Sequence, residues 1–255
     1  MKALITGASS GIGKDIALYL SKLGYDLIVV ARRKDRLEEL KKLCATKVEV
    51  ITLDLSVANN CFKLYELTKK DKIDILVNNS GFGLCGEFNT TDLDRELEMI
   101  DLNIKSLHIL TKLYLSDMIK RNKGYILNIG SSAAFAPGPL MATYYSSKSY
   151  VLRLSESIYE EIKQMKSNVS ISVLCPGPVE TEFNDVANVN FAFKPLTSEY
   201  VAKYAINKMF KNKLIIIPGF SMKLSRIFSK ILPDTLTSKI IFRSQKRKLK
   251  LFPLF

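Results

Sequence analysis

The chain has 255 residues, 47% of them hydrophobic, and this size and composition suit one globular α/β domain with a large core. No apolar run reaches eighteen residues and the four cysteines share no metal-ligand spacing, so we expect no membrane-spanning helix, no metal site and a reducing, cytoplasmic location. The net charge of +13 is uneven, because residues 221–255 contain nine Lys or Arg against one acidic residue, whereas the first 220 contain 29 against 24.

The chain begins with a predicted strand, a glycine-rich turn and a helix. Residues 2–6 are an apolar run directly after Met1, so we also expect no signal peptide. Gly7, Gly11 and Gly13 follow, in a spacing that differs from the usual G-x-G-x-x-G fingerprint. This order of elements points backbone N–H groups and a helix dipole at a phosphate; a turn that only closes a strand–helix corner is the alternative. We predict that the inner face of the helix consists of Ile16, Ala17, Leu20 and Leu23.

The second predicted strand, residues 26–30, ends at Ala31, Arg32 and Arg33. In a nucleotide-binding fold this end faces the adenosine ribose, where an acidic residue binds a 2′-hydroxyl. Arginine suits a 2′-phosphate instead, and we assign that contact to Arg32. Arg33 is expected to begin the exposed face of the next helix, which is also the alternative for Arg32.

Strands and helices alternate through the following residues. We predict strands at 48–53, 73–77, 125–129 and 169–174, and helices near 57–70, 91–101 and 103–121, with a long helix ending near 167. This alternation predicts a Rossmann-type doubly wound parallel sheet with helices on both faces, in one domain of residues 1–220. Because ligands of such sheets bind at the carboxyl ends of the strands, we place the site there.

Tyr144 and Lys148 are four residues apart, so on a helix their side chains share one face. A nearby ammonium group lowers the pKa of a tyrosine and suits the phenol for donating and accepting protons. Ser131 follows the preceding strand, and its hydroxyl could hold a carbonyl oxygen at the same point. Alone, a Tyr-x-x-x-Lys pair also fits an ordinary surface helix.

Five motifs in this order resemble the short-chain dehydrogenase/reductase family, in the branch with chains of roughly this length, over about residues 1–220. They are the glycine turn at 6–13, the stretch 78–81 with Ser80 in the place of an alanine, the position of Asn103, the serine–tyrosine–lysine set, and the segment 176–181. The family spacing selects Ser131 rather than Ser132, and Tyr144 rather than Tyr145.

This resemblance implies that Asn103, Ser131, Tyr144 and Lys148 are catalytic. Tyr144 would donate a proton to a carbonyl oxygen while hydride arrives from a nicotinamide, and Ser131 would orient and polarise that carbonyl. Lys148 would hold the nicotinamide ribose and lower the pKa of Tyr144. Asn103 would anchor a water that passes protons to Lys148.

The resemblance also implies NADP(H) as the cofactor, since Ala31-Arg32 is similar to the NADP-preferring pattern of the family. Asp54 and Leu55 would contact the adenine, and Thr181 the nicotinamide carboxamide. The implied cofactor-binding residues are Gly7, Ser9, Ser10, Gly11, Ile12, Gly13, Arg32, Asp54, Leu55, Asn79, Ser80, Gly81, Tyr144, Lys148, Pro176, Gly177, Val179 and Thr181.

Residues 182–197 are expected to form a substrate lid. Phe183 from this segment, with Phe135 and Tyr145, would form an apolar pocket beside Ser131 for a hydrophobic ketone, aldehyde or alcohol. The alternative is that these phenylalanines are core residues under a loop. A homodimer or homotetramer is the expected assembly.

Residues 221–255 extend past the family's minimal fold as a predicted pair of basic amphipathic helices. Their predicted apolar stripes consist of Met222, Ile227, Phe228, Ile231 and Leu232, and then of Leu236, Ile240 and Ile241. We favour packing on the body or on a second subunit over peripheral contact with an anionic membrane. Nucleic-acid binding is not expected, because no aromatic stacking platform accompanies the charge.

The leading hypothesis is therefore an NADP(H)-dependent oxidoreductase that transfers hydride between the nicotinamide and a carbonyl or alcohol group of a hydrophobic small molecule. The alternative is a non-catalytic protein that keeps the fold and senses dinucleotides or interacts at a membrane surface. The complete set of Ser131, Tyr144 and Lys148 favours the enzyme.

Overall fold

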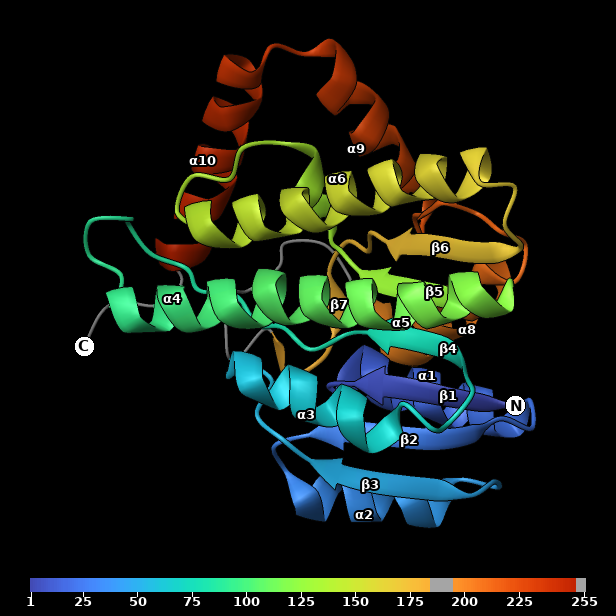
Figure 1. Cartoon of the computed structure of the whole chain (residues 1–255). Helices are drawn as coiled ribbons and strands as arrows, with labels where there is room; N and C mark the ends of the chain where they lie inside the picture. Colours follow the sequence, from blue (N-terminus) through green and yellow to red (C-terminus); the bar gives the residue numbers. More distant parts are fainter. Residues whose placement is uncertain (184–194, 251–255) are drawn as a thin grey trace.

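A seven-stranded parallel sheet lies at the centre of the computed structural model, which describes residues 1–183 and 195–250, with the backbone alone for 247–250. The strand order is β3-β2-β1-β4-β5-β6-β9 (Figure 1). The strands are β1 (Lys2–Thr6), β2 (Asp26–Ala31), β3 (Val48–Thr52), β4 (Ile73–Asn78), β5 (Gly124–Ile129), β6 (Val169–Leu174) and β9 (Ile215–Ile216). This architecture confirms the predicted doubly wound sheet.

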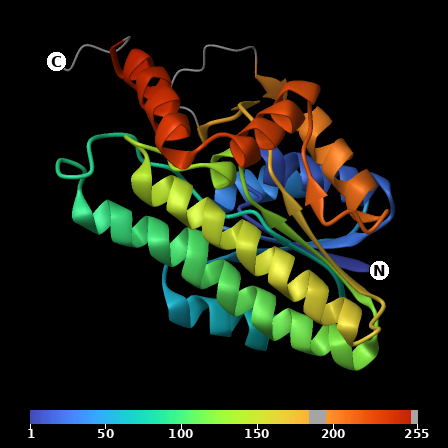
Figure 2. The same cartoon turned by 90° about the horizontal axis from the view of Figure 1, so that it is seen from above.

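Helices cover both faces of the sheet, as the view from above shows (Figure 2). One face packs against α1 (Gly11–Lys22), α2 (Lys34–Leu43) and α8 (Ser198–Met209). The other face packs against α3 (Ala58–Thr68), α5 (Leu107–Arg121) and α6 (Ala142–Gln164). A strand that is covered on both faces needs apolar side chains on both. Residues 27–31 of β2 are apolar and all buried, as this arrangement requires.

The order of the strands determines where a crevice opens at the edge of the sheet. From β1 the chain moves outward to β2 and β3, and it then returns to the opposite side of β1 to form β4. The connections after β1 and β4 therefore diverge at the carboxyl edge and leave a crevice between them, where ligands of open α/β sheets bind.

The predicted break between two helices near residue 102 is wrong. Helix α4 (Leu93–Ile100) continues through a π-helical segment (Asp101–Ser106) directly into α5. A π-helical turn accommodates one more residue than an α-helical turn, so the axis continues while the side chains change direction. This local change positions Asn103, as described below.

Two further details differ from the sequence-based expectations. Helix α1 ends at Lys22, so Leu23 is its C-cap residue and is exposed instead of completing the inner face. The short strands β7 (Val179–Glu180) and β8 (Leu196–Thr197), which pair with each other, and β9 were not predicted. Two residues are too few to show any alternation of apolar and polar side chains.

The C-terminal segment forms a helical hairpin of α9 (Phe220–Ile231) and α10 (Asp234–Lys250), which stands at the top of Figure 1. Its first predicted stripe is wrong, because Met222 and Leu232 line the cavity described below whereas Ile227 and Ile231 are exposed. Five residues along a helix rotate the side chain by about 140°, which moves Ile227 away from the side of Met222. The division of the chain into residues 1–220 and 221–255 stays a prediction.

Among the described residues, no helix is long and apolar enough to cross a membrane.

Candidate active site

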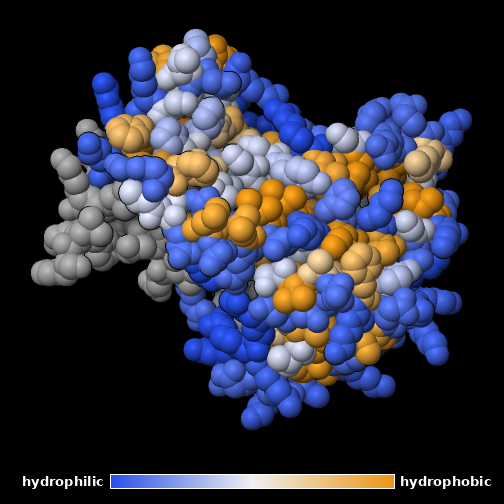
Figure 3. Space-filling view, turned by 60° about the vertical axis from the view of Figure 1, so that its left-hand side comes forward, coloured by the Kyte–Doolittle hydropathy of each residue, from blue (hydrophilic) through white to orange (hydrophobic). Residues whose placement is uncertain are grey.

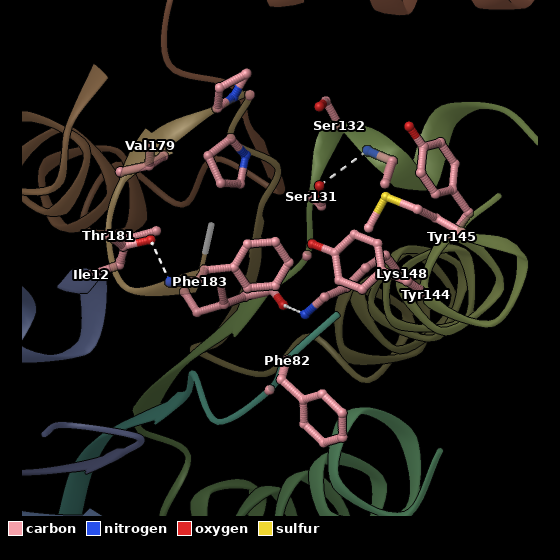
Figure 4. Close-up of a pocket in the computed structure, with 18 of the residues that line it drawn as sticks. Ile12, Phe82, Ser131, Ser132, Tyr144, Tyr145, Lys148, Val179, Thr181 and Phe183 are labelled. Atoms are coloured by element: carbon pink, nitrogen blue, oxygen red, sulfur yellow. Dashed lines mark hydrogen bonds between the residues drawn. The ribbon is translucent and has the colours of Figure 1, made fainter. Parts of the chain in front are cut away.

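A cavity of about 830 Å³ opens where the sheet's connections diverge at its carboxyl edge. Its walls come from the loops after β1, β2, β4, β5 and β6, from the start of α6, and from α9 and α10. Figure 4 shows the part of the wall that carries Ser131, Tyr144 and Lys148. The cavity therefore brings together segments that are far apart in the sequence.

Tyr144 and Lys148 lie on the first two turns of α6 and share one face, as their spacing predicts. Both are buried, with 8% and 6% of their surface exposed. The Lys148 Nζ donates a hydrogen bond to the Ile129 carbonyl oxygen at 2.9 Å and lies 5.9 Å from the centroid of the Tyr144 ring. The end of β5 thus holds the lysine beside the tyrosine (Figure 4).

Ser131 follows β5 by two residues and caps the short 3₁₀ helix Ser132–Phe135. Its Oγ accepts a hydrogen bond from the Ala133 backbone N–H at 3.1 Å. In Figure 4 Ser131 and Tyr144 face the same part of the cavity, whereas Tyr145 lines another part of its wall. The geometry thus selects the same serine and tyrosine as the spacing.

Burial controls the protonation of this pair. It raises the pKa of Tyr144, and the Ser131 hydroxyl offsets only part of the effect. It also lowers the pKa of Lys148 from 10.5 to about 8. The expected lowering of the tyrosine pKa is therefore wrong for this structure, because burial desolvates the phenolate and this is the largest effect on the pKa. The phenol is protonated at neutral pH, which is the form that a proton donor needs.

Asn103 lies behind the cavity wall, in the π-helical segment, and is buried. Its amide Nδ2 donates to the Phe82 carbonyl at 2.9 Å and to Ser147 Oγ at 3.1 Å, and its Oδ1 accepts from the Phe82 N–H at 3.1 Å. Ser147 in turn donates to the Tyr144 carbonyl at 2.7 Å. Asn103 thereby ties the loop after β4 to the turn of α6 that carries Tyr144.

The glycine turn after β1 fits closely against the end of β4. A Cβ atom on Gly7 would lie 2.7 Å from Asn79 Nδ2, and one on Gly11 would lie 2.8 Å from Thr181 Cγ2. Both glycines have positive φ angles, 64° and 53°, which other residues rarely adopt. Asn79 fixes the turn, since its Nδ2 donates to the carbonyls of Thr6 and Gly7 at 3.0 Å each.

The hydrogen-bond donors of this turn suit a phosphate group. The first N–H groups of α1 have no partner within the helix, and the helix dipole favours negative charge at that end. The hydroxyls of Ser9 and Ser10 line the same part of the cavity. A dinucleotide would therefore place its pyrophosphate here.

The two arginines after β2 point in different directions. The guanidinium of Arg33 donates to Ser10 Oγ at 2.9 Å and to Ser9 Oγ at 3.1 Å, and it pairs with Glu182 at 2.8 Å. The hydrogen bond from Arg33 to the Glu182 carboxylate lowers the pKa of Glu182. Arg33 therefore faces the glycine turn, contrary to the expectation that it only begins an exposed helix face.

Arg32 also lines the cavity, next to Asp54. Its NH1 lies 3.6 Å from the Asp54 carboxylate and 3.2 Å from that of Glu98. Burial acts to raise the pKa of Asp54, but hydrogen bonds from Ser56 and the charge of Arg32 outweigh it, so the pKa is lowered. The carboxylate is thus charged and ready to accept a hydrogen bond.

The cavity gathers almost all residues that the sequence singled out. Of the predicted cofactor-binding set only Gly13 does not line it; Gly13 instead packs against Asn79. The four predicted substrate-binding residues, Ser131, Phe135, Tyr145 and Phe183, all line it. The predicted lid falls outside the described residues over 184–194.

Comparison with known proteins gives the family. The family model of the short chain dehydrogenases matches residues 1–190. This chain belongs to that family. An uncharacterized oxidoreductase of Staphylococcus epidermidis is 31% identical over 186 residues, which are 72% of this chain and 80% of the relative. Human 17-beta-hydroxysteroid dehydrogenase type 3 is 33% identical over 211 residues, which are 80% of this chain and 67% of the relative.

A solved structure of a short-chain dehydrogenase agrees with this family assignment. The short-chain dehydrogenase of Sphingobium yanoikuyae, in complex with NADPH, matches with a TM-score of 0.80 at 28% identity, over 86% of this chain and 88% of that one. As a short-chain dehydrogenase, the chain is an oxidoreductase that acts on alcohol or carbonyl groups, and a nicotinamide dinucleotide is the cofactor typical of its family.

Residues of the C-terminal hairpin were missed as parts of the site. Gln245 of α10 is buried, and its Nε2 donates to Tyr145 Oη at 3.0 Å and contacts Met141 Sδ at 3.6 Å. Met222 of α9 packs on Gly177. No local signal identifies these contacts, because they depend on how the hairpin folds back over a distant part of the short-chain dehydrogenase domain.

Proposed function

We propose that this protein is an NADP(H)-dependent oxidoreductase that transfers hydride between the nicotinamide and a carbonyl or alcohol group of a bulky, apolar small molecule. The observation that carries the proposal is the convergence of Ser131, Tyr144 and Lys148 on the wall of a cavity that also contains the glycine turn. A proton donor and a phosphate-binding turn in one cavity suit hydride transfer coupled to proton transfer.

The cofactor preference rests on the end of β2. Two guanidinium groups and no acidic residue directly follow Ala31, which suits a 2′-phosphate better than a free hydroxyl. We propose Arg33 beside the predicted Arg32 for this contact, since its guanidinium group lies against Ser9 and Ser10. The complex of the Sphingobium relative with NADPH agrees with this proposal.

The nicotinamide supplies or accepts the hydride, and the side chains of this chain handle the proton. In the reducing direction, the buried phenol of Tyr144 donates its proton to the substrate oxygen as negative charge develops there. The Ser131 hydroxyl donates a hydrogen bond to the same oxygen and stabilises that charge. Lys148, held by the Ile129 carbonyl, stabilises the phenolate that remains.

The substrate class follows from the opposite wall of the cavity. Phe183 stacks obliquely on Tyr144 with ring centroids 5.3 Å apart, and Leu232 and Ile240 of the hairpin line the same space. Large apolar side chains beside the predicted catalytic tyrosine suit a bulky hydrophobic ketone or alcohol. The name of the human relative, a hydroxysteroid dehydrogenase, points to the same class.

The test is turnover of the purified protein with a panel of aliphatic, aromatic and polycyclic ketones and their alcohols. NADPH and NADH are followed by their absorbance. We expect NADPH-dependent reduction of the bulky apolar ketones. Activity with NADH alone, or only with small polar substrates, would contradict the proposed cofactor and substrate class.

A further inference from the structure

Helix α9 has three different sides. The side toward the body lines the active-site cavity through Met222, Ser225 and Ser229. The second side is basic: Lys223 and Lys230 are exposed, whereas Arg226 between them is half-buried and pairs with Glu156 of the body at 3.8 Å. The third side is apolar and consists of Phe220, Leu224, Ile227, Phe228 and Ile231, all of them exposed.

The apolar side is unusually open for its size. Phe220 is 75% exposed, Ile227 54% and Ile231 72%. Leu236 and Ile240, one turn apart on α10, add 45% and 52% exposed side chains to the hairpin. Large apolar side chains gathered on two adjacent helices mark an interaction surface rather than scattered surface residues.

The charge of the hairpin selects the partner. Residues 221–255 carry nine Lys or Arg and only Asp234 as an acidic residue. Two such hairpins placed face to face would repel each other, which argues against a second copy of this chain. An anionic phospholipid surface offers both the negative charge and the apolar interior that this surface needs.

We propose that the α9–α10 hairpin docks on an anionic lipid surface, with the exposed apolar side of α9 in the headgroup region and the basic side chains on the phosphates. The contact is peripheral and lies in the plane of the interface. It places the wall of the active-site cavity next to the membrane, since Phe228 belongs both to the exposed side and to that wall. Figure 3 shows hydrophobic and hydrophilic residues side by side on the hairpin, at the top of the view.

The test is sedimentation of the full chain with vesicles of phosphatidylglycerol and phosphatidylcholine, and with vesicles of phosphatidylcholine alone. We expect binding to the anionic vesicles only and release at high salt, because salt screens the electrostatic part. The double variant Ile227→Glu/Ile231→Glu should lower the partition coefficient at least about tenfold, since both side chains would leave the apolar layer.

The matched control is Phe62→Glu, which places the same charge on an exposed apolar residue of α3. It should bind the vesicles nearly as well as the unaltered chain. Circular dichroism and the reduction of a water-soluble ketone show that each variant is folded and active, so a failure of the proposed chemistry is distinguishable from a failure of docking. The proposal would be overturned if the unaltered chain bound both vesicle types equally or bound neither. It would also be overturned if the double variant kept its vesicle binding and instead lost its oligomeric state.

Discussion

Two adjacent tyrosines on α6 have different surroundings. Tyr144 lies beside Lys148 and Ser131, whereas the hydroxyl of Tyr145 accepts a hydrogen bond from Gln245. We therefore expect Tyr144, and not Tyr145, to exchange a proton with a substrate held by Ser131. The difference between the two is testable by removing one oxygen atom at a time.

Tyr144→Phe should lower kcat by about 10²–10⁴, the range that a general acid contributes, while NADPH still binds. Tyr145→Phe should keep most of kcat, because it loses only the contact with Gln245. Steady-state kinetics and fluorescence titration of NADPH measure both effects. The reverse order of the two variants would show that the catalytic tyrosine is assigned wrongly.

Arg33→Ala should weaken NADPH binding about ten- to a hundredfold, since hydrogen bonds to charged groups contribute roughly 1.5–3 kcal/mol. Arg32→Ala should have a similar effect, and NADH binding should change little in both variants. Lys42→Ala, at the far end of α2, is the control and should change neither. Equal losses for NADPH and NADH would indicate that the arginines support the turn and not the 2′-phosphate.

Lys148 gives a prediction on stability and pH. Its pKa is about 8 in the folded protein and 10.5 when solvated, so between these values the unfolded chain binds more protons than the folded one. The contribution of Lys148 to stability therefore rises with pH from about 8 to 10.5. Below pH 8 its burial as a cation costs about 3 kcal/mol, at about 1.4 kcal/mol for each pKa unit.

Lys148→Met should thus raise the free energy of unfolding at pH 7 by up to about 3 kcal/mol, less the lost hydrogen bond to Ile129. The gain should shrink or reverse near pH 10, and turnover should be lost. Urea unfolding at the two pH values measures the difference. A gain that is the same at both would exclude the titration of Lys148 as its cause.

At the scale of elements, the buried amide of Gln245 ties α10 to the site. The Nε2 of Gln245 binds Tyr145, but its Oε1 is buried without a hydrogen-bond partner among the described residues. Such an unpaired acceptor is costly, so removing the whole amide should change the stability little. We expect Gln245 to be a positioning residue, which would act on the substrate through Tyr145.

Gln245→Leu should raise the KM for a bulky ketone about fivefold, the equivalent of one hydrogen bond, with little change in kcat or melting temperature. Lys246→Ala, an exposed residue next to it, is the control. Kinetics with one bulky and one small ketone separate an effect on the positioning of the bulky substrate from a general effect on the enzyme. A large fall in melting temperature with an unchanged KM would mean that Gln245 only holds α10 in place.

At the scale of the whole molecule, exposed apolar residues also form a stripe on α4. Leu93, Leu97 and Ile100 are spaced by four and three residues, so they share one side of the helix. We propose this side as part of the contact in a homodimer or homotetramer.

Leu93→Glu/Leu97→Glu should therefore lower the molecular mass in solution, as measured by light scattering after size exclusion. Phe62→Glu serves again as the control. An unaltered mass in the double variant would place any subunit contact elsewhere on the molecule.

Local patterns predicted the order of the main strands and helices, the parallel sheet, and the shared face of Tyr144 and Lys148, because apolar periodicity selects the elements and four residues on a helix bring two side chains to one face. The choice of Ser131 over Ser132 and of Tyr144 over Tyr145 rested on the resemblance to the family. The glycine turn was equally readable, because Gly7 and Gly11 adopt positive φ angles that other residues rarely adopt.

Three features depend on the folded structure: the direction of Arg33, the raised pKa of Tyr144, and the division of the apolar residues of α9 between the cavity and the exposed side. Arg33 points to Ser9 and Ser10 because β1 and β2 are neighbours in the sheet, which its position next to Arg32 does not reveal. The pKa depends on how much water the surrounding segments exclude, and this differs from the effect of one nearby lysine. Long-range packing sets both the direction of Arg33 and the pKa of Tyr144, and the local spacing of residues contains no information about that packing.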